Sequence, residues 1–453
     1  MQVEPPEIAA RATVSPRWSA RRSRLGLAWA RLDASQRAAA TAAARALVGS
    51  RVLVWVAGTV AFLAWGVAVH AHSFDPAGLT RGLGAVGDAL AAPAARWDAS
   101  WYLSIAHGGY GAHLVGAGDG GVAFFPLYPL LLWALGSLGA NLVAAGIVVS
   151  MVALLVALYL THRLAELEFG AGDAARLAVM ATALFPMAFF FSAVYSEALY
   201  LALSLGVFWM ARHGRWAAVG ALGGLAAATR STGVLLMIPA LVLYLYGPRE
   251  DATAASARAR WRPRYQLRRD VLWLALIPAG LGAYLGYLGL QGADPLAPFA
   301  AQQVWFRHFA GPFGGVWDGA VAAWQGARQL LSGSRAHVYF TGAGGDPFIA
   351  AEHNIVLFGF LAAAIPALVG VARRLPVAYG AYVLAALALP LSYPVTPQPL
   401  MSLPRFLAAL FPLHLWTGSW LARHPRARLP VLSLYAAGLV VFTAQFATWH
   451  WVA

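Results

Sequence analysis

The sequence predicts an all-α polytopic membrane protein with about eleven transmembrane helices. The chain of 453 residues is 60% hydrophobic and only 11% charged, whereas about a quarter of the residues in soluble proteins are charged. Its charges gather between long apolar runs, as expected where each span must exclude charge and satisfy its own backbone. The 18 tryptophans cluster near the ends of these runs, where aromatic rings suit the headgroup zone.

The basic residues predict the sidedness of the spans. All of them are arginine, the net charge is +14, and they concentrate in short segments, which indicates the cytoplasmic side and not nucleic-acid binding. Residues 1–51 are predicted to form a basic cytoplasmic arm, helical through Ser35–Ala46 and lying against anionic lipid. Residues 52–453 would form a single transmembrane domain. The other arginine-rich segments are Arg212–Arg215, Arg249–Arg269, Arg373–Arg374 and Arg423–Arg428.

Apolar runs of nearly bilayer length give the individual spans, with the N-terminus inside and the C-terminus outside. The short Val122–Leu138, interrupted by prolines, is predicted to be a juxtamembrane helix instead of a crossing. Two long segments of mixed charge, about 71–121 and 291–352, would then be outer loops. The predicted spans are Val52–His70, Asn141–Thr161, Ala174–Phe191, Tyr195–Ala211, Ala217–Thr229, Thr232–Tyr246, Val271–Leu290, Asn354–Val371, Val377–Ser392, Leu403–Leu421 and Leu429–Trp449.

The first outer loop contains the most informative residues. On a helix, Asp98 shares its face with Trp101 and Tyr102. Partial loss of water beside these rings would make the carboxylate a stronger proton acceptor, so Asp98 is a candidate catalytic base and Arg96, Trp97, Trp101 and Tyr102 are candidate substrate contacts. The alternative is that Asp98 pairs with Arg96 or caps a helix, while the rings only anchor that helix.

Three further charged residues interrupt or open apolar runs. Glu197, which follows Tyr195, lies between two spans and either lines a cavity or is a first-turn acid favoured by the helix dipole. Arg230 breaks an apolar run and requires a partner, either Glu197 or a ligand phosphate. Arg405 either binds an anionic headgroup or extends harmlessly toward the interface.

The second outer loop supplies polar candidates for contact with a sugar or an acceptor: Gln302, Gln303, Arg307 and His308. The GxGxxG match at Gly82–Gly87 has no preceding strand and is a weak indication of a nucleotide site. DxD, HExxH and cysteine are all absent from the sequence, so we predict no metal site and no cofactor.

These residues suit glycosyl transfer from a lipid-phosphate sugar. That reaction needs a base to deprotonate the acceptor hydroxyl and cations to stabilise the departing phosphate. Asp98 would be the base, and Arg230 and Arg405 would bind the donor phosphate.

A series of motifs follows in order along the chain: Arg96-Trp-Asp-Ala-Ser-Trp-Tyr102, Phe124-Phe-Pro-Leu-Tyr-Pro129, Tyr195-Ser-Glu197, Ala228-Thr-Arg-Ser231, Pro404-Arg-Phe406 and Phe411-Pro-Leu413. This series resembles the PIG-V-type mannosyltransferases, and the resemblance extends from about Val52 to the C-terminus. In eukaryotes this family, which is like GPI mannosyltransferase 2, adds the second mannose during GPI-anchor assembly. The all-arginine composition here is typical of a bacterial member.

The resemblance implies the GT-C class, whose members use polyprenyl-phosphate sugars on the non-cytoplasmic side with an acidic base in the first outer loop, here Asp98. The function hypothesis is an inverting mannosyltransferase of the bacterial plasma membrane that acts on a lipid or glycan acceptor, surrounded by membrane lipids and without a nucleic-acid partner. A transporter or lipid flippase is the alternative from another class, and a catalytically silent assembly partner is a third possibility.

Overall fold

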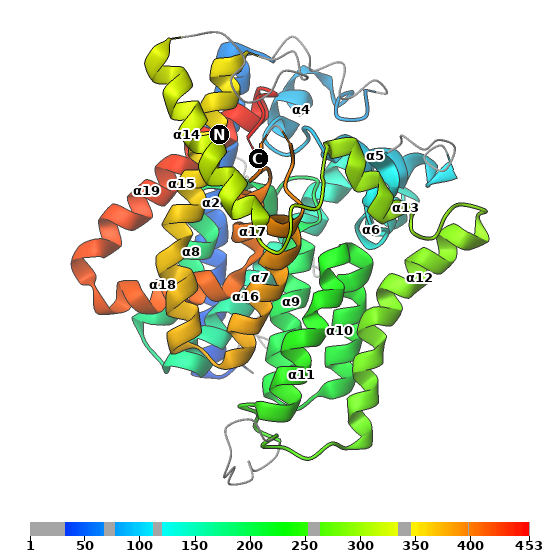
Figure 1. Ribbon diagram of the computed structural model, residues 1–453, viewed down its shortest axis with the longest axis vertical. Helices are drawn as coiled ribbons and strands as arrows, with labels where there is room; N and C mark the ends of the chain where they lie inside the picture. Colours follow the sequence, from blue (N-terminus) through cyan, green and yellow to red (C-terminus); the bar gives the residue numbers. More distant parts are fainter. Residues whose placement is uncertain are drawn as a thin grey trace, which may run out of the picture.

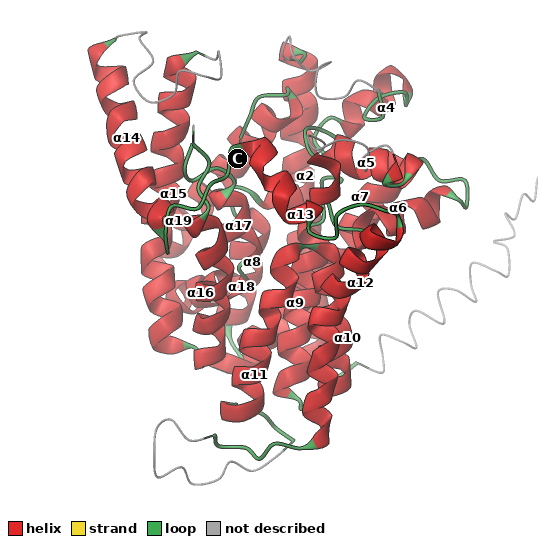
Figure 2. Ribbon diagram, turned by 45° about the vertical axis from the view of Figure 1, so that its right-hand side comes forward, coloured by secondary structure: helices red, strands yellow, loops and turns green. Residues whose placement is uncertain are grey.

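A computed structural model describes residues 32–67, 78–111, 120–251, 263–333, 346–396 and 398–452. Within these ranges the regular elements are α-helices and 3-10 helices, together with one isolated bridge between Arg307 and Val395. Figures 1 and 2 show the long helices side by side in a bundle. The predicted all-α class is confirmed.

Five helical segments in the described part are long and apolar enough to cross a membrane. The chain is therefore a helical membrane protein, while the predicted number of crossings and the GT-C arrangement stay predictions. The five segments are α2 (Ala34–Trp65), α7 (Leu142–Phe169), η5 with α12 (Arg269–Ala275 and Leu276–Leu290), α15 (Pro347–Arg374) and α19 (Pro425–Ala447). Shorter helices include α6 (Leu127–Gly136), α9 (Glu197–Arg212), α10 (Trp216–Thr229), η4 (Ser231–Leu236), α11 (Met237–Tyr246) and α16 (Val377–Ser392).

The helix that contains the first predicted span begins well before the span itself. Helix α2 begins at Ala34, where Asp33 and Gln36 form a capping box, and continues to Trp65 without interruption at Val52. The apolar pattern placed Arg51 before the span, but this side chain is buried within the bundle. Residues 1–31 of the predicted arm lie outside the described residues.

Two other predicted spans are interrupted. The span Ala174–Phe191 is divided into α8 (Asp173–Leu184) and η3 (Ala188–Phe191) around Pro186. The span Leu403–Leu421 is divided into α17 (Leu403–Ala409) and α18 (Phe411–Arg423). Proline explains both divisions, because its ring and missing N–H prevent a helix from continuing through it, and Pro412 lies in the first turn of α18.

The two predicted outer loops contain helices. The first includes α4 (Gly84–Ala91), α5 (Ala99–Gly108) and the 3-10 turn η2 (Gly120–Ala123); the second includes α13 (Ala297–Ala300), η6 (Ala301–Trp305) and α14 (Gly314–Ser332). Helix α14 packs along α15, which begins seven residues before the predicted span at Asn354. Figure 1 shows α4, α5, α13 and α14 at one end of the bundle, with the end of α11 at the other.

Glycines bring α10 and α12 into close contact. A Cβ on Gly280 would overlap the carbonyl oxygen of Gly224, and a Cβ on Gly223 would lie 2.5 Å from Cγ1 of Ile277. Small residues of this kind allow membrane helices to approach closely enough for extensive van der Waals contact. The contact fixes the course of α10, which ends at Thr229, immediately before Arg230.

We predict that Gly280→Ala destabilises the protein by about 1–3 kcal/mol, because the added methyl group forces α10 and α12 apart. Gly286→Ala, on the same helix but with no atom within 4 Å of its Cβ, is the matched control. Thermal unfolding in detergent measures both variants. Equal unfolding midpoints would show that close approach at Gly280 does not hold the helices together.

Candidate functional site

Four charged residues predicted from distant parts of the sequence lie together in what we call the charge network: Asp98, Glu197, Arg230 and Arg405. Nη1 of Arg405 lies 2.6 Å from Oδ2 of Asp98, and Nε of the same guanidinium pairs with Oε1 of Glu197. Nη1 of Arg230 pairs with that same Glu197 oxygen. The expected partner of Arg230 is therefore Glu197, and Glu197 joins both arginines.

Each member of the network lies at the end of a helix or at a break between helices. Asp98 is the N-cap of α5, Glu197 is the first residue of α9, and Arg230 lies in extended conformation between α10 and η4. Arg405 is in the first turn of α17. Helix ends leave backbone groups without helical partners and so allow polar side chains at depths where continuous helix would be apolar.

The backbone on either side of the network adopts sparsely populated conformations. Trp97, immediately before Asp98, has a φ of 52°, and Ser402, the N-cap of α17, has a φ of 67°. Such positive values cost free energy for residues other than glycine and persist where surrounding contacts impose them. Here they lie in the segments that lead into Asp98 and Arg405.

Burial is unequal within the network, and its formal charges cancel. The side chain of Glu197 is 1% exposed and that of Arg405 is 9% exposed, whereas Arg230 and Asp98 are 19% and 20% exposed. Two carboxylates and two guanidinium groups give a neutral set. Ligand access is therefore greatest at the two ends of the network, Asp98 and Arg230.

Aromatic rings enclose the central guanidinium. The Cζ of Arg405 lies 5.2 Å from the ring centre of Phe190 and 4.8 Å from that of Tyr195. The Tyr195 hydroxyl accepts from the backbone N–H of Asp98 at 3.0 Å and donates to the carbonyl of Arg96 at 3.1 Å. Tyr195 therefore fixes the loop that carries Asp98, and its cation–π contact stabilises the charge of Arg405.

Tyr102 and Trp101 extend this aromatic cluster along α5. The buried Tyr102 hydroxyl lies 2.8 Å from Oγ of Ser196, next to Glu197. Trp101 stacks on Phe124 with ring centres 5.7 Å apart. The predicted aromatic stripe thus packs α5 against the segments that contain Phe124 and Glu197.

The segment before α5 is attached to the end of α19. Arg96 is buried, donates from Nε to the carbonyl of Ala447 at 3.0 Å and lies 5.5 Å from the ring centre of Trp449. Trp97 donates from Nε1 to the carbonyl of His450 at 3.2 Å.

Asp98 occupies the N-cap position of α5 but makes no capping hydrogen bond with its side chain. Its carboxylate pairs with Arg405, so the capping alternative is not what the geometry shows.

The second predicted outer loop contacts the first through aromatic rings. Trp305, at the end of η6, packs edge-on against Phe124 at 6.1 Å. Gln302 is half-buried and Gln303 exposed in the same turn, and in the described part of the chain no hydrogen bond joins either to the charge network. The structure thus leaves the two glutamines outside the network itself.

Arg307 adds positive charge near the network. Burial and the positive charge of Arg405 lower the pKa of Arg307 to about 10, and its Nη1 donates to the carbonyl of Tyr393 at 3.0 Å. Nδ1 of the neighbouring His308 lies 3.3 Å from Oγ1 of Thr396. The charges of Arg307 and Arg405 therefore influence each other. The sequence had indicated only that Arg307 is a polar candidate for contact with a sugar or an acceptor.

Arg51 is a functional-site neighbour that the sequence reasoning missed. It donates from Nη1 to the carbonyl of Ala188 at 2.8 Å and to Oγ of Ser192 at 2.7 Å, and from Nη2 to the carbonyl of Ala183 at 3.2 Å. These groups surround the break between α8 and η3, just before Glu197. The sequence shows Arg51 directly before a run of apolar residues. This position was interpreted as the boundary of the first span and not as a buried arginine.

Among the described residues, no group of three histidine, aspartate or glutamate side chains is placed to hold a metal ion. The chemistry of the site is that of two carboxylates and two guanidinium groups within aromatic surroundings. Such a set can accept a proton and stabilise an anion.

Comparison with known families agrees with the motifs. Residues 83–243 match the family model described as Mannosyltransferase (PIG-V). The predicted resemblance to this family is confirmed. The matched range includes Asp98, Glu197 and Arg230 and excludes Arg405, and it indicates a membrane-bound glycosyltransferase of the mannosyltransferase type. No curated protein and no solved structure matches the chain.

We predict that Glu197→Gln destabilises the protein by about 3–5 kcal/mol, because it leaves two guanidinium groups without their shared carboxylate. Thermal unfolding in detergent measures the effect. Glu250→Gln is the control, since Glu250 is 53% exposed and lies 3.5 Å from His213. An unfolding midpoint for Glu197→Gln equal to that of the control would contradict the assignment.

Proposed function

We propose that the protein is an inverting mannosyltransferase that moves a sugar from a polyprenyl-phosphate donor to a hydroxyl of a lipid or glycan acceptor. The observation that carries this proposal is the charge network, in which the partly exposed Asp98 and Arg230 lie at the two ends of a neutral set of side chains. The family match supports the transferase class. The arginine-rich short segments support an active site on the non-cytoplasmic face of a bacterial plasma membrane.

The reaction requires one proton acceptor and one stabilised leaving group. Asp98 takes the proton of the acceptor hydroxyl as that oxygen attacks C1 of the donor sugar. The bond between C1 and the phosphate oxygen breaks, and its electron pair leaves with the polyprenyl phosphate. Attack from the face opposite the leaving group inverts the configuration at C1.

The geometry of Asp98 is suited to this role. Its Oδ2 is held by Arg405 at 2.6 Å, while Oδ1 makes no hydrogen bond with a described residue. One oxygen thus fixes the orientation of the carboxylate and the other is open to the acceptor. A base held in this way loses little freedom when the reaction begins.

The two arginines have different roles in this proposal. Arg405 is buried between two carboxylates and acts as a positioning residue for Asp98. Within the described part of the chain Arg230 has a single carboxylate partner, and its side chain is more exposed than that of Arg405, so it binds the donor phosphate. Arg307 adds positive charge beside them, and Glu197 keeps both guanidinium groups in place. This arrangement stabilises the charge that develops on the phosphate.

We predict that Asp98→Asn lowers transfer by about 10²–10⁴-fold, because the amide keeps the shape of the side chain but cannot accept the proton. The measurement is product formation by the protein in lipid vesicles supplied with labelled polyprenyl-phosphate mannose and membrane lipid acceptors. Asp318→Asn on α14, which lies outside the charge network, is the control and should retain normal transfer.

Unchanged transfer by Asp98→Asn would falsify the assignment of the base. If the wild-type protein instead moves the labelled lipid across the bilayer without forming product, the transporter or flippase alternative is favoured. The same vesicles distinguish these outcomes, because movement changes the accessibility of the label while transfer changes its chemical form.

The roles of the two arginines predict different kinetic effects. Arg230→Gln should raise the KM for the donor about tenfold or more and lower kcat, because it removes a charged contact to the phosphate. Arg405→Lys should lower kcat while changing the donor KM less, because an ammonium group cannot hold Asp98 and Glu197 at once as the guanidinium does. A raised donor KM with unchanged kcat in Arg405→Lys would instead indicate that Arg405 contacts the phosphate.

A further inference from the structure

Near the charge network, a separate group of polar side chains lines a pocket. The pocket is formed by one face of α15, one face of α19, the segment after α19 and the loop before α17. We call it the polar pocket. Its lining consists of Glu352, His353, Val356, Leu357, Gln398, Val441, Phe442, Gln445, Trp451 and Val452.

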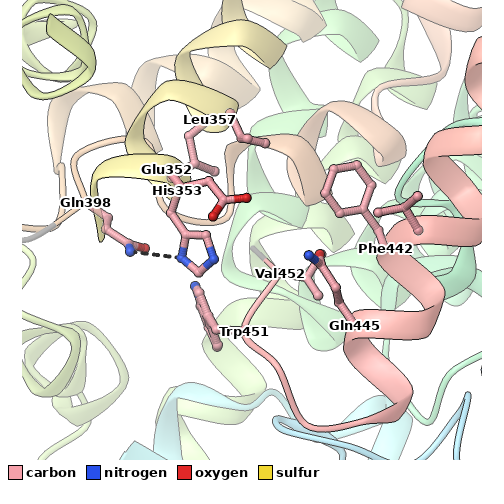
Figure 3. A pocket seen from close by; sticks show the side chains of 10 residues that line it. Glu352, His353, Leu357, Gln398, Phe442, Gln445, Trp451 and Val452 are labelled. Atoms are coloured by element: carbon pink, nitrogen blue, oxygen red, sulfur yellow. Dashed lines mark hydrogen bonds between the residues drawn. The ribbon is translucent and has the colours of Figure 1, made fainter. Parts of the chain in front are cut away.

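The polar groups of this pocket converge on its interior. Figure 3 shows the carboxylate of Glu352, the imidazole of His353 and the amide of Gln445 around a common space, with the indole of Trp451 along one side. Nε2 of Gln398 lies 3.3 Å from Nδ1 of His353. The polar lining is thus one carboxylate, one imidazole and two carboxamides.

One of these groups is buried without a partner. Oε1 of Gln398 is inaccessible to solvent and has no hydrogen bond in the structure. A buried carbonyl oxygen left in this state costs free energy, so native proteins normally supply it with a donor. A ligand hydroxyl becomes such a donor when the Gln398 amide turns toward the pocket that this residue lines.

The composition of the lining selects the class of ligand. A lipid chain would leave the buried oxygen of Gln398 without a donor, and a phosphate would meet the carboxylate of Glu352 without any arginine in the lining. An uncharged sugar ring has many hydroxyls for the polar groups and an apolar face for Trp451 and Phe442. Pockets of this type, mostly apolar with a few convergent polar groups, bind small ligands.

The position of the pocket connects it to the proposed reaction. Trp451 packs edge-on against Trp97 with ring centres 5.2 Å apart, and Trp97 immediately precedes Asp98. Gln398 lies in the loop that leads into α17 and Arg405. The pocket therefore borders the segment that carries Asp98 and includes part of the loop that leads to Arg405.

We infer that the polar pocket binds an uncharged carbohydrate ring and is the site for the sugar of the acceptor. Its role as the acceptor site rests on the proposed function, whereas its ability to bind a sugar does not. Glu352 and Gln398 accept hydrogen bonds from the ring hydroxyls, and Trp451 covers the apolar face of the ring.

The test measures binding of methyl α-D-mannopyranoside to the full chain in neutral phospholipid nanodiscs by saturation-transfer difference NMR. Glu352→Gln and Gln398→Leu should each weaken binding about tenfold or more, because each removes a hydrogen-bond acceptor for the sugar. Glu250→Gln and Gln291→Leu, both at exposed positions outside the pocket, are the matched controls and should bind as the wild type does. Thermal unfolding shows that each variant is folded.

A second pair of variants tests the role of the Trp451 indole. Trp451→Phe should weaken binding, while Trp324→Phe, at a position 65% exposed on α14, should not. No saturation transfer in the wild type, or normal binding by both Glu352→Gln and Gln398→Leu, would overturn the inference.

Asp98→Asn separates this inference from the proposed function. It should lose mannosyl transfer and keep sugar binding, since Asp98 does not line the pocket. A wild type that forms product without binding the probe at this pocket would refute the inference alone. A wild type that binds the probe there but forms no product would refute the proposed function and leave a carbohydrate site.

Discussion

The shared carboxylate of Glu197 is the interaction on which the rest of the site depends. It is almost completely buried, and it holds the guanidinium groups of both Arg230 and Arg405. A single arginine at this depth would be costly in free energy, and two without a common anion would repel each other. Because Glu197 neutralises both, Arg405 can also reach Asp98, and four chain segments that are remote in sequence converge at one point.

Helix breaks make this convergence possible within a bundle of apolar helices. Continuous helices would carry the chain past the site, whereas α5, α9, α10 and α17 all begin or end there. Proline and positive-φ residues produce some of these ends, and tight glycine contacts between α10 and α12 hold them in register. The cost of the irregular backbone is offset by the hydrogen bonds and ion pairs that its polar groups make.

The sequence predicted the helical class, the approximate course of most helices and all four members of the charge network. Charged residues in apolar runs are rare enough to be recognised one at a time. It did not predict which of them pair, because Asp98 and Arg405 are separated by 307 positions and local pattern carries no information on such contacts. The breaks after α8 and before α18 were missed because hydropathy is insensitive to a single proline. The polar pocket was missed because its lining comes from three separate segments between residues 352 and 452.

The burial of Arg51 against residues much later in the chain bears on how the protein is made. Its partners at Ala183, Ala188 and Ser192 lie more than 130 residues later in the chain. At about 5–20 residues per second, the ribosome needs roughly 7–28 s to produce them. During that interval α2 carries an arginine whose insertion in the middle of a membrane helix costs about 3 kcal/mol. The burial of Arg51 is therefore complete only when α8 and η3 are in place, which couples the placement of the N-terminal helix to that of the segment before Glu197.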